Sequence, residues 1–420
     1  MRLLYLIHNN PRASGGTEKH ALQLANAAAA NGHEVTFLYP RVSKQDMEPS
    51  LEETHEGAIR FLELKRQVHN NFLPPGPREK KLNELYGSVL DKYAPDIIHI
   101  HHLKNLPSGC LPMSIISMAR TVFSLQDYEY FCMKTHLVRS NGDFCESSGG
   151  GANCAIHCLP RALRAKAILS QPFKSITGDP DFVKFLRATI VNRQTAFKKI
   201  HCVLAASQYV IDRFKAEGFV SANIKLLELG INNFEAMPKE PAKRPVRFLF
   251  LGNINHEKGI DLVLEAFRQI SPQDASLTIY GGFVSKEARP LLDSAVKNLS
   301  HVKHAGPYEE SELPRIFAGA DCLINPTRRH ETFSLVLSET WMAKTPVIAA
   351  ASGALATRIV NGNGALLFPP GDLNEMTKCI KSVIDKPEIL DNLRQTIPDV
   401  MTIEKYYEQI ERVYKNEDRN

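Results

Sequence analysis

The stretch ADCLINPTRRHETFSLVLSETWMAKTPVIAA, residues 320–350, contains the pattern on which the fold assignment rests. Two short apolar runs, CLIN at 322–325 and PVIAA at 346–350, flank a segment with helical spacing that begins near Ser334. Apolar runs of this length that alternate with helices are typical of a parallel sheet covered on both faces. Between the runs lie two carboxylates, Glu331 and Glu339, with seven residues between them. The stretch therefore predicts strand, helix and strand, with acidic groups in the loop and helix after the first strand.

The same alternation continues toward both ends of the chain. The N-terminal half contains the apolar runs RLLYLIH, EVTFLYP, IRFLEL, DIIHIHH, TVFSLQD, HCVLAAS and IKLLELG, with helical patterns at about 17–31 and 78–93. The second half begins again at VRFLFLG, after the segment FEAMPKEPAKRP at 234–245, which is rich in Pro, Lys and Glu and is interpreted as a linker. We therefore predict an α/β protein of two Rossmann-like domains, at 1–235 and 236–395. Residues 396–420 are expected to form a C-terminal helix that returns to the N-terminal domain.

The bulk composition limits the class of protein. A chain of 420 residues with 43% apolar and 23% charged residues is long enough for two ordinary globular cores. The net charge of +5 is too small to require nucleic acid, but it suits an anionic substrate or membrane surface. The opening apolar run, Leu3 to Ile7, is too short for a secretory signal, and no stretch approaches the ~18 apolar residues of a spanning helix. We expect a soluble, cytoplasmic protein, with peripheral contact at the inner face of a membrane left open.

Glycine-rich loops follow the first strand of each half, where ligands bind in such folds. Gly15 and Gly16 open the helix in SGGTEKH, and a helix N-terminus favours an anion. In the second half, LGNINHEKG offers Gly252, Asn253 and Lys258, and the lysine is placed to neutralise a phosphate. Neither loop has the G-x-G-x-x-G pattern of dehydrogenases. An ordinary turn and a solvated lysine remain the alternatives for these two loops.

The segment 327–341 is the strongest candidate for a ligand site. Pro326 ends the preceding strand, Thr332 or Ser334 can cap the following helix, and backbone N–H groups around Thr332 to Leu335 face a bound ligand. A phosphate there would leave Glu331 beside one end of the ligand and Glu339 beside the other. Because carboxylates accept hydrogen bonds from paired hydroxyls, the site suits a phosphate between two polyols. A solvated helix face is the alternative.

Four motifs resemble those of the retaining family 4 glycosyltransferases of GT-B fold. GNINHEKGIDLVLEAF (252–267), the quoted stretch 320–350 and NGNGALLFPPGD (361–372) resemble their donor-binding domain, and GGTEKHALQLANAAAANGHEV (15–35) resembles their N-terminal glycine loop. The resemblance implies two Rossmann-like domains that face each other across a cleft holding a nucleoside diphosphate sugar. It also implies that Glu331 contacts the transferred sugar, Glu339 the ribose and Lys258 the diphosphate, assisted by amides of Thr332, Phe333, Ser334 and Leu335.

The chain departs from the family pattern at three positions. Asn253 stands where the family usually has Arg, so that Arg328 and Arg329 are candidate substitutes for the missing charge. The family's His-Asp pair appears as Gln126 and Asp127, which removes an imidazole and leaves Asp127 as a candidate catalytic residue. Lys344 replaces the usual Gly before TPV.

Four of the eight cysteines lie in one insert at about 131–159. Cys132, Cys145, Cys154 and Cys158 supply four thiolates, which suit tetrahedral zinc. We predict a structural zinc site, with four buried reduced thiols as the alternative. A zinc-ribbon module for nucleic acid is disfavoured, because the loop is mostly neutral.

Basic and apolar residues interleave at 160–176 and 182–199. Such a surface could contact anionic lipid or a lipid-linked acceptor, and an amphipathic helix of the N-terminal domain is the alternative.

The expected function is retaining transfer of a sugar from a nucleoside diphosphate sugar to a glycan or lipid-linked acceptor, without a catalytic metal and without nucleic acid. A nucleotide-sugar epimerase or phosphorylase of the same fold, and a catalytically weakened sugar-nucleotide binding protein, remain open.

Overall fold

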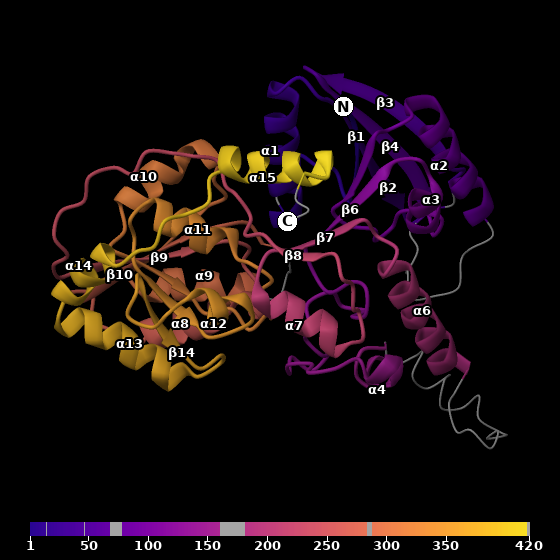
Figure 1. Cartoon of the computed structure of the whole chain (residues 1–420). Helices are drawn as coiled ribbons and strands as arrows, with labels where there is room; N and C mark the ends of the chain where they lie inside the picture. The colour runs from indigo at the N-terminus through magenta and orange to yellow at the C-terminus, as the bar shows by residue number, and fades with distance from the viewer. Residues whose placement is uncertain (14, 46, 68–77, 160–180, 284–287, 418–420) are drawn as a thin grey trace. The chain divides into compact units, whose positions relative to one another are not determined.

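The computed structural model describes residues 1–417 except 14, 46, 68–77, 160–180 and 284–287. The chain divides into two compact units (Figure 1). The first unit comprises Met1–Gly230 with Ile403–Asn420, and the second comprises Ile231–Thr402.

The first unit is built on an eight-stranded sheet with the order β3-β4-β2-β1-β5-β6-β7-β8. Its strands are β1 (Arg2–Leu6), β2 (Glu34–Ser43), β3 (Ser50–Glu56), β4 (Ile59–Gln67), β5 (Ile97–Ile100), β6 (Arg120–Leu125), β7 (Cys202–Ala205) and β8 (Ile224–Leu226). All neighbouring strands are parallel except β3, which pairs antiparallel with β4 at one edge. The sequence did not predict β3, because SLEETHE has almost no buried side chain and so lacks apolar periodicity.

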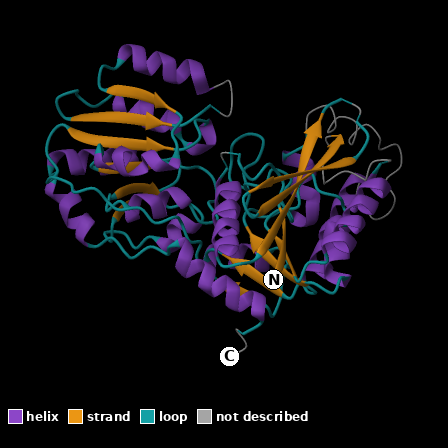
Figure 2. Ribbon diagram, turned by 90° about the horizontal axis from the view of Figure 1, so that it is seen from above, coloured by secondary structure: helices purple, strands orange, loops and turns teal. Residues whose placement is uncertain are grey.

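Helices cover this sheet and connect its strands (Figure 2). They are α1 (Gly16–Ala30), α2 (Glu79–Tyr93), α3 (Cys110–Ile116), α4 (Ala152–His157), α6 (Asp181–Phe197) and α7 (Gln208–Ala216), with a short 3-10 turn η1 (Gly149–Gly151). The last helix, α15 (Ile403–Lys415), also belongs to this unit and lies against α1 (Figure 1). Tyr414 of α15 lies with its hydroxyl 2.9 Å from that of Tyr5 on β1. The end of the chain therefore contributes to the core of the first unit.

The second unit has a six-stranded parallel sheet with the order β11-β10-β9-β12-β13-β14. Its strands are β9 (Val246–Leu251), β10 (Ala275–Tyr280), β11 (Val302–Gly306), β12 (Cys322–Asn325), β13 (Val347–Ala350) and β14 (Ala365–Phe368). Its helices are α8 (Ile260–Phe267), α9 (Ala288–Asn298), α10 (Leu313–Ala318), α11 (Leu335–Met342), α12 (Ala354–Arg358), α13 (Leu373–Asp385) and α14 (Glu388–Gln395), with 3-10 turns η2 (His256–Lys258) and η3 (Glu310–Glu312). This order is the doubly wound Rossmann order.

The strand order fixes where ligands can bind in each unit. In a doubly wound sheet the chain reverses its winding direction at one point, and a crevice opens there beyond the carboxyl ends of two strands. In the first unit this point lies between β1 and β5, and in the second between β9 and β12. The loops that follow these strands therefore carry the candidate sites.

The segment predicted as a linker, 234–245, lies on the second unit. Phe234 stacks with Phe317 of α10, with ring centroids 6.4 Å apart. The ammonium of Lys239 donates hydrogen bonds to the carbonyls of Phe317 and Ala320, each at 2.7 Å. The structure therefore begins the second unit at Ile231, ahead of the predicted linker.

No helix in the described part of the chain is both long enough and apolar enough to cross a membrane.

Candidate functional site

The second unit brings Lys258 and Glu331 together at its switch point. Lys258 ends η2, in the loop after β9, and Glu331 lies in the loop after β12. The Lys258 ammonium lies 2.5 Å from Glu331 Oε1, and the Thr327 hydroxyl donates to the same oxygen at 3.0 Å. Burial raises the pKa of Glu331, but the charges and hydrogen bonds of Lys258, Arg329 and Thr327 outweigh it and lower the pKa overall. The pair is therefore an ionised carboxylate and an ammonium at the edge where ligands bind.

Two loop contacts fix the backbone around this pair. The Asn255 side chain accepts a hydrogen bond from the N–H of Lys258 at 2.8 Å and caps η2. Gly353, in the loop after β13, has φ +59, and a Cβ there would lie 2.4 Å from the backbone N and O of Glu331. The N–H of Ala354 donates to the Glu331 carbonyl at 2.7 Å. Only glycine allows this close approach, and no sequence motif pointed to Gly353.

The turn between Glu331 and α11 presents backbone groups. Ser334 is the N-cap residue of α11, in the left-handed region at φ +74, and its side chain makes no capping hydrogen bond. The prediction of a hydroxyl cap is therefore wrong for Ser334, because this backbone geometry turns the hydroxyl elsewhere. Phe333 is buried, so that only its backbone can face a ligand. Thr332 and Leu335 are half-buried in the same turn.

Arg358, at the end of α12, stabilises the turn between Glu331 and α11 through contacts with Phe333 and Ser338. Its guanidinium lies 3.6 Å from the Phe333 ring centroid and donates to the Phe333 carbonyl at 2.7 Å. A second nitrogen donates to the Ser338 hydroxyl at 3.0 Å. No motif pointed to Arg358 in the sequence, because its partners lie on a different strand-to-helix connection.

Glu339 lies on α11 and is buried, with 3% of its surface exposed. The expected spacing of two helical turns from Glu331 is not observed, because Glu331 lies in the loop and α11 begins only at Leu335, which places Glu339 about one turn into the helix. The charge of Glu339 helps to raise the pKa of Tyr308, although burial contributes more. Carboxylate oxygens accept hydrogen bonds from hydroxyl groups, so Glu339 is a candidate contact for a ligand that enters beside the helix.

The two arginines proposed to replace the missing charge at Asn253 have other partners. Arg328 binds Asp261 of α8 through two hydrogen bonds of 2.7 and 2.9 Å. Arg329 donates to Glu257 at 2.6 Å. Asn253 itself is exposed, beside Gly252 at φ +135. Lys258 is therefore the candidate cation for a phosphate, and its ammonium is paired with Glu331.

In the first unit, the glycine loop and His8 meet beyond the end of β1. Gly15 is the N-cap residue of α1 and Gly16 is its first residue. A Cβ on Gly15 would lie only 2.0 Å from Glu18 Oε2, since the Glu18 carboxylate folds back over the start of the helix. His8 Nε2 lies 3.3 Å from Glu18 Oε1. The helix N-terminus, where the sequence predicted an external anion, therefore already holds a carboxylate of the chain.

His102 follows β5 and lies between two carboxylates that follow β6. Its Nε2 is 2.7 Å from Asp127 Oδ2, and its Nδ1 is 3.0 Å from Glu129 Oε1. Burial lowers the pKa of His102, but these two carboxylates raise it to about 10. Asp127 also accepts from the Glu129 N–H at 2.8 Å. Asp127 is therefore paired with an imidazole, but this imidazole belongs to His102 in the loop after β5 and not to position 126.

These three side chains are the group in the described residues that could hold a metal ion. A metal does not fit, because each ring nitrogen of His102 faces a different carboxylate on opposite sides of the ring. Two salt-bridging hydrogen bonds to an imidazolium account for the arrangement.

The cysteine insert packs against the first unit, and Cys132 and Cys145 belong to the main hydrophobic core of that unit. Cys132, Cys145 and Cys154 are buried and Cys158 is half-buried. Burial, with smaller contributions from the neighbouring cysteines, raises the pKa of Cys132 and Cys154 to about 12. Among the residues described, no three of these sulfurs lie within 4.8 Å of one another. This arrangement corresponds to neutral buried thiols, and the zinc site stays a prediction.

Of the two basic apolar stretches, 160–176 lies outside the described residues. The other forms α6, which buries Leu186 and Ile190 against the unit. Arg193 of α6 donates to the carbonyls of Glu129 and Tyr130 at 2.9 and 3.0 Å. The helix therefore supports the segment that carries Glu129.

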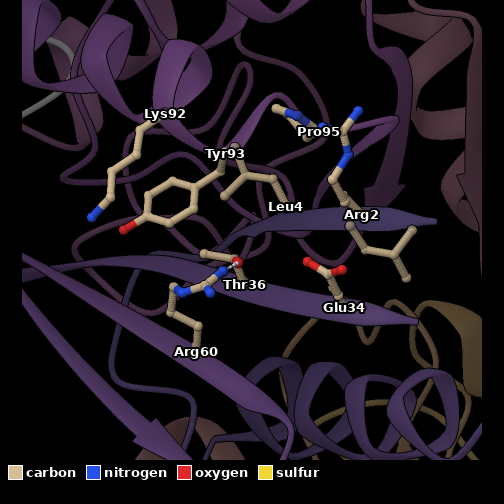
Figure 3. Close-up of a pocket in the computed structure, with 9 residues that line it drawn as sticks. Arg2, Leu4, Glu34, Thr36, Arg60, Lys92, Tyr93 and Pro95 are labelled. Carbon is tan, nitrogen blue, oxygen red and sulfur yellow. Dashed lines mark hydrogen bonds between the residues drawn. The ribbon is translucent and has the colours of Figure 1, made fainter. Parts of the chain in front are cut away.

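A separate pocket of about 320 Å³ lies at the amino ends of β1 and β2 (Figure 3). Its cations have partners: Arg2 pairs with Asp96 at 2.9 Å, and Lys92 pairs with Glu53 at 3.0 Å. The pocket lies at the edge of the sheet opposite the loops described above and shares no residue with them.

Comparison with known families agrees with this arrangement of two units. Residues 245–386 match the family described as "Glycosyl transferases group 1", and residues 14–139 match "Glycosyltransferase Family 4". The chain is therefore a glycosyltransferase of these families, built as two Rossmann-like domains in the GT-B fold.

Relatives extend the similarity over most of the chain. Glycogen synthase of Mycobacterium tuberculosis is 22% identical over 401 residues, which span 90% of this chain and 84% of that protein. The structure of sucrose-phosphate synthase from Thermosynechococcus elongatus has a TM-score of 0.66 at 18% identity and covers 99% of this chain and 98% of its own. The structure of Anabaena HepE in complex with UDP has the same TM-score at 16% identity and covers 99% and 100%.

Proposed function

We propose that the chain is a retaining, metal-independent glycosyltransferase that moves a sugar from a nucleoside diphosphate sugar to a hydroxyl of a glycan or lipid-linked acceptor. The pair of Lys258 and Glu331 at the switch point of the second unit carries this proposal. A diphosphate leaving group needs positive charge, and a transferred sugar offers hydroxyls to a carboxylate.

The donor would bind with its diphosphate at Lys258 and at the first turn of α11. Ser334 makes no side-chain cap there, so that backbone N–H groups of the turn are available to phosphate oxygens. Glu331 would then accept hydrogen bonds from hydroxyls of the sugar, and Glu339, about one turn into α11, from those of the ribose. Stabilising the leaving diphosphate lowers the barrier without an acid/base pair in this unit.

Relatives support a uridine or adenosine diphosphate sugar as the donor. Structures similar to this chain include Anabaena HepE with UDP-glucose and Arabidopsis thaliana starch synthase IV with ADP and acarbose. They support the donor class, while the base, the sugar and the acceptor are left to experiment.

A second candidate is a sugar-nucleotide binding protein with weakened catalysis. Asn253 carries no charge, and Arg328 and Arg329 bind carboxylates of α8 and η2. Lys258 would then be the main cation for two phosphates, which favours slower release of the diphosphate.

A donor panel distinguishes these functions. Thermal shift and nucleoside diphosphate release would be measured with UDP-, ADP- and GDP-sugars, with and without maltoheptaose or a lipid-linked acceptor, in the presence of EDTA. A retaining transferase releases diphosphate and forms a product with the donor's anomeric configuration. An epimerase returns an isomeric donor, a phosphorylase forms a sugar phosphate, and a binding protein shows a thermal shift without release.

Glu339→Ala tests the donor site in the same panel. Loss of hydrogen bonds to a hydroxyl pair weakens binding by about 1–3 kcal/mol, or roughly 5- to 150-fold. Unchanged affinity for UDP and ADP in a folded variant would reject the ribose role. Cosedimentation with anionic vesicles tests the proposed membrane contact independently.

A further inference from the structure

Three neighbouring strands of the first unit end in a single cluster of charged side chains. His8 follows β1, His102 follows β5, and Asp127 and Glu129 follow β6. The imidazole rings of His8 and His102 stack with centroids 3.8 Å apart and an interplanar angle of 28°. Because β1 and β5 flank the switch point of this sheet, the stacked pair lies where the first unit would bind a ligand.

Hydrogen bonding assigns different charges to the two rings. Two carboxylates face the two nitrogens of His102, and a carboxylate accepts but does not donate, so a proton belongs on each nitrogen. The backbone N–H of Lys104 also lies 3.1 Å from His102 Nδ1, but this neutral amide is a weaker hydrogen-bond partner for Nδ1 than the Glu129 carboxylate. A second positive charge stacked at 3.8 Å is unfavourable, so His8 is neutral. Burial and the charge of His102 accordingly lower the pKa of His8 to about 3.

The contact with Glu18 assigns the His8 tautomer. Nε2 lies 3.3 Å from Glu18 Oε1, and it donates its proton to that carboxylate. Nδ1 is then left as an acceptor, and it is buried without a hydrogen-bond partner among the residues described. Of the His8 side chain, 24% is exposed, so the ring borders solvent, but Nδ1 itself has no exposed surface, and a hydroxyl that reaches Nδ1 has to displace the atoms that cover it.

The surrounding charges select the kind of group that can bind. The charged groups that face the two rings are Glu18, Lys104, Asp127 and Glu129. Glu18, Asp127 and Glu129 supply three negative charges, whereas Lys104 and the imidazolium of His102 supply two positive charges. A phosphate is disfavoured here, especially since Glu18 already covers the start of α1. An uncharged hydroxyl that donates a hydrogen bond fits the free lone pair.

We propose that His8 Nδ1 accepts a hydrogen bond from an uncharged sugar hydroxyl of the acceptor, and that His102 is a positioning residue that keeps His8 neutral and fixed. Asp127 and Glu129 orient His102, and Arg193 of α6 holds the backbone carbonyl of Glu129. Asp127, expected from the sequence as catalytic, thus acts through His102. This proposal rests on the glycosyltransferase function and names the acceptor-binding group of the first unit.

Kinetics of His8 variants test the contact. UDP-glucose and ADP-glucose serve as donors and maltoheptaose as acceptor, with binding of UDP and ADP measured separately. We expect His8→Ala to raise the acceptor KM or lower kcat at least 30-fold, while UDP and ADP affinity stays within twofold. His8→Asn, whose amide replaces Nδ1, recovers more activity than His8→Gln, whose amide replaces Nε2. The control His55→Gln, on the exposed strand β3, leaves both constants unchanged.

The protonation states have their own measurement. Imidazole ¹⁵N spectra of the natural protein are expected to show His102 doubly protonated at pH 8 and His8 neutral at pH 5.5. In His102→Gln, His8 loses its charged neighbour and titrates closer to 6.5, so the pH profile of transfer gains an acid limb between about pH 5 and 6.5. His102 is buried, so if this variant does not fold, the spectra of the natural protein and the His8 kinetics decide.

Two results would overturn the proposal: His8→Ala with kcat and KM within twofold of the natural protein, or a His102 that is neutral at pH 8. Failure of the proposed function is distinguishable, because then the natural protein itself consumes none of the UDP-, ADP- and GDP-sugars of the donor panel, even by slow hydrolysis. In that case the ¹⁵N spectra still accept or reject the charge assignment.

Discussion

Lys258 and Glu331 hold each other in the second unit by a contact of 2.5 Å, and a donor would have to share both. We expect Lys258→Ala to lower turnover on the order of 100-fold, because the diphosphate leaves without its main counter-charge. The free energy of unfolding changes much less, since Thr327 still donates to Glu331. Steady-state kinetics and a urea titration measure the two effects. Arg329→Ala is the matched variant, because its guanidinium pairs with Glu257. If Arg329→Ala lost turnover and Lys258→Ala kept it, the phosphate role would pass to Arg329.

Gly353 fixes the position of the Glu331 carboxylate, because it packs closely against the Glu331 backbone. An alanine Cβ would lie 2.4 Å from Glu331 N and O, so that Gly353→Ala must displace Glu331. We expect at least a tenfold loss of affinity for UDP-glucose or ADP-glucose, whose sugar Glu331 would contact, together with lower stability. Gly371→Ala is the control: its φ is +79, but nothing lies within 4 Å of an added Cβ. It costs about 1 kcal/mol of stability and leaves donor affinity unchanged. Equal affinity in both variants would show that the Glu331 backbone is not part of the donor site.

At the scale of one helix, the C-terminus of α11 shows why glycine is usual at the position of Lys344. Its N–H donates to the Trp341 carbonyl at 2.9 Å, and the Thr345 N–H donates to the Thr340 carbonyl at 3.0 Å. This hydrogen-bond pair is the Schellman motif, whose left-handed position favours glycine. Lys344 has φ +51, which costs a non-glycine residue about 1 kcal/mol. We expect Lys344→Gly to raise Tm by a few degrees without changing nucleotide affinity. Lys344→Ala, which removes the charge but keeps a Cβ, should show no gain, and a gain there would point to charge instead of backbone strain.

The cysteine insert is an element whose stability depends on whether it binds metal. Burial raises the pKa of Cys132 and of Cys154 to about 12, and it outweighs hydrogen bonds from the N–H groups of Leu137 and Lys134, which lower the pKa of Cys132, and from that of Met133, which lowers the pKa of Cys154. If zinc binds, metal analysis of fresh protein finds about one ion per chain, and Cys154→Ser releases it. The first unit then loses stability while nucleotide binding in the second unit persists. Cys379→Ser, on α13, is the control and retains the metal. Protein without zinc or iron would establish the alternative of four reduced thiols.

How much the sequence predicted depends on how far apart the contacting residues lie. Most of the parallel strands were predicted because they are continuous apolar runs, such as VRFLFL in β9, whereas the short strand β14 was not predicted. Lys258, Glu331 and Glu339 were proposed as site residues from the sequence because they lie in local motifs. His102 was not, since its partner Asp127 follows a different strand, 25 residues later, and only the pairing of β5 with β6 brings them together. The role of Gly353 likewise depends on the loop after β13 reaching Glu331.

On the scale of the whole molecule, the two units differ in their buried imidazoles. The core of the first unit contains His20 on α1 and His99 and His101 at β5, packed against Tyr5 and tyrosines of α15. Both nitrogens of His20 and of His101 lack a hydrogen-bond partner among the described residues. Burial lowers the pKa of His20 and of His99 to about 3, and that of His101 well below its ordinary value.

These depressed pKa values make the first unit sensitive to acid. The unfolded chain binds a proton at each of these histidines below about pH 6.5, whereas the folded unit does not until about pH 3. Stability therefore falls as the pH decreases through this window, by up to about 1.4 kcal/mol per pH unit for each histidine. The raised pKa of His102 acts in the opposite direction, but its contribution is fully present below about pH 6.5 and is lost only as the pH rises through about 10. With a typical stability of 5–15 kcal/mol, we expect the first unit to unfold between about pH 4 and 5.5.

The single tryptophan, Trp341, lies on α11 of the second unit, so its fluorescence reports that unit alone. On acid titration, far-UV circular dichroism is expected to lose the signal of the first unit before Trp341 emission changes. His20→Leu removes one buried imidazole whose nitrogens have no partner among the described residues, and it should move the first midpoint to lower pH and reduce its proton uptake by about one. His55→Leu, on the exposed strand β3, should leave the midpoint in place. An unchanged midpoint in His20→Leu, or a first unit still folded at pH 3, would contradict the assignment of acid sensitivity to these buried rings.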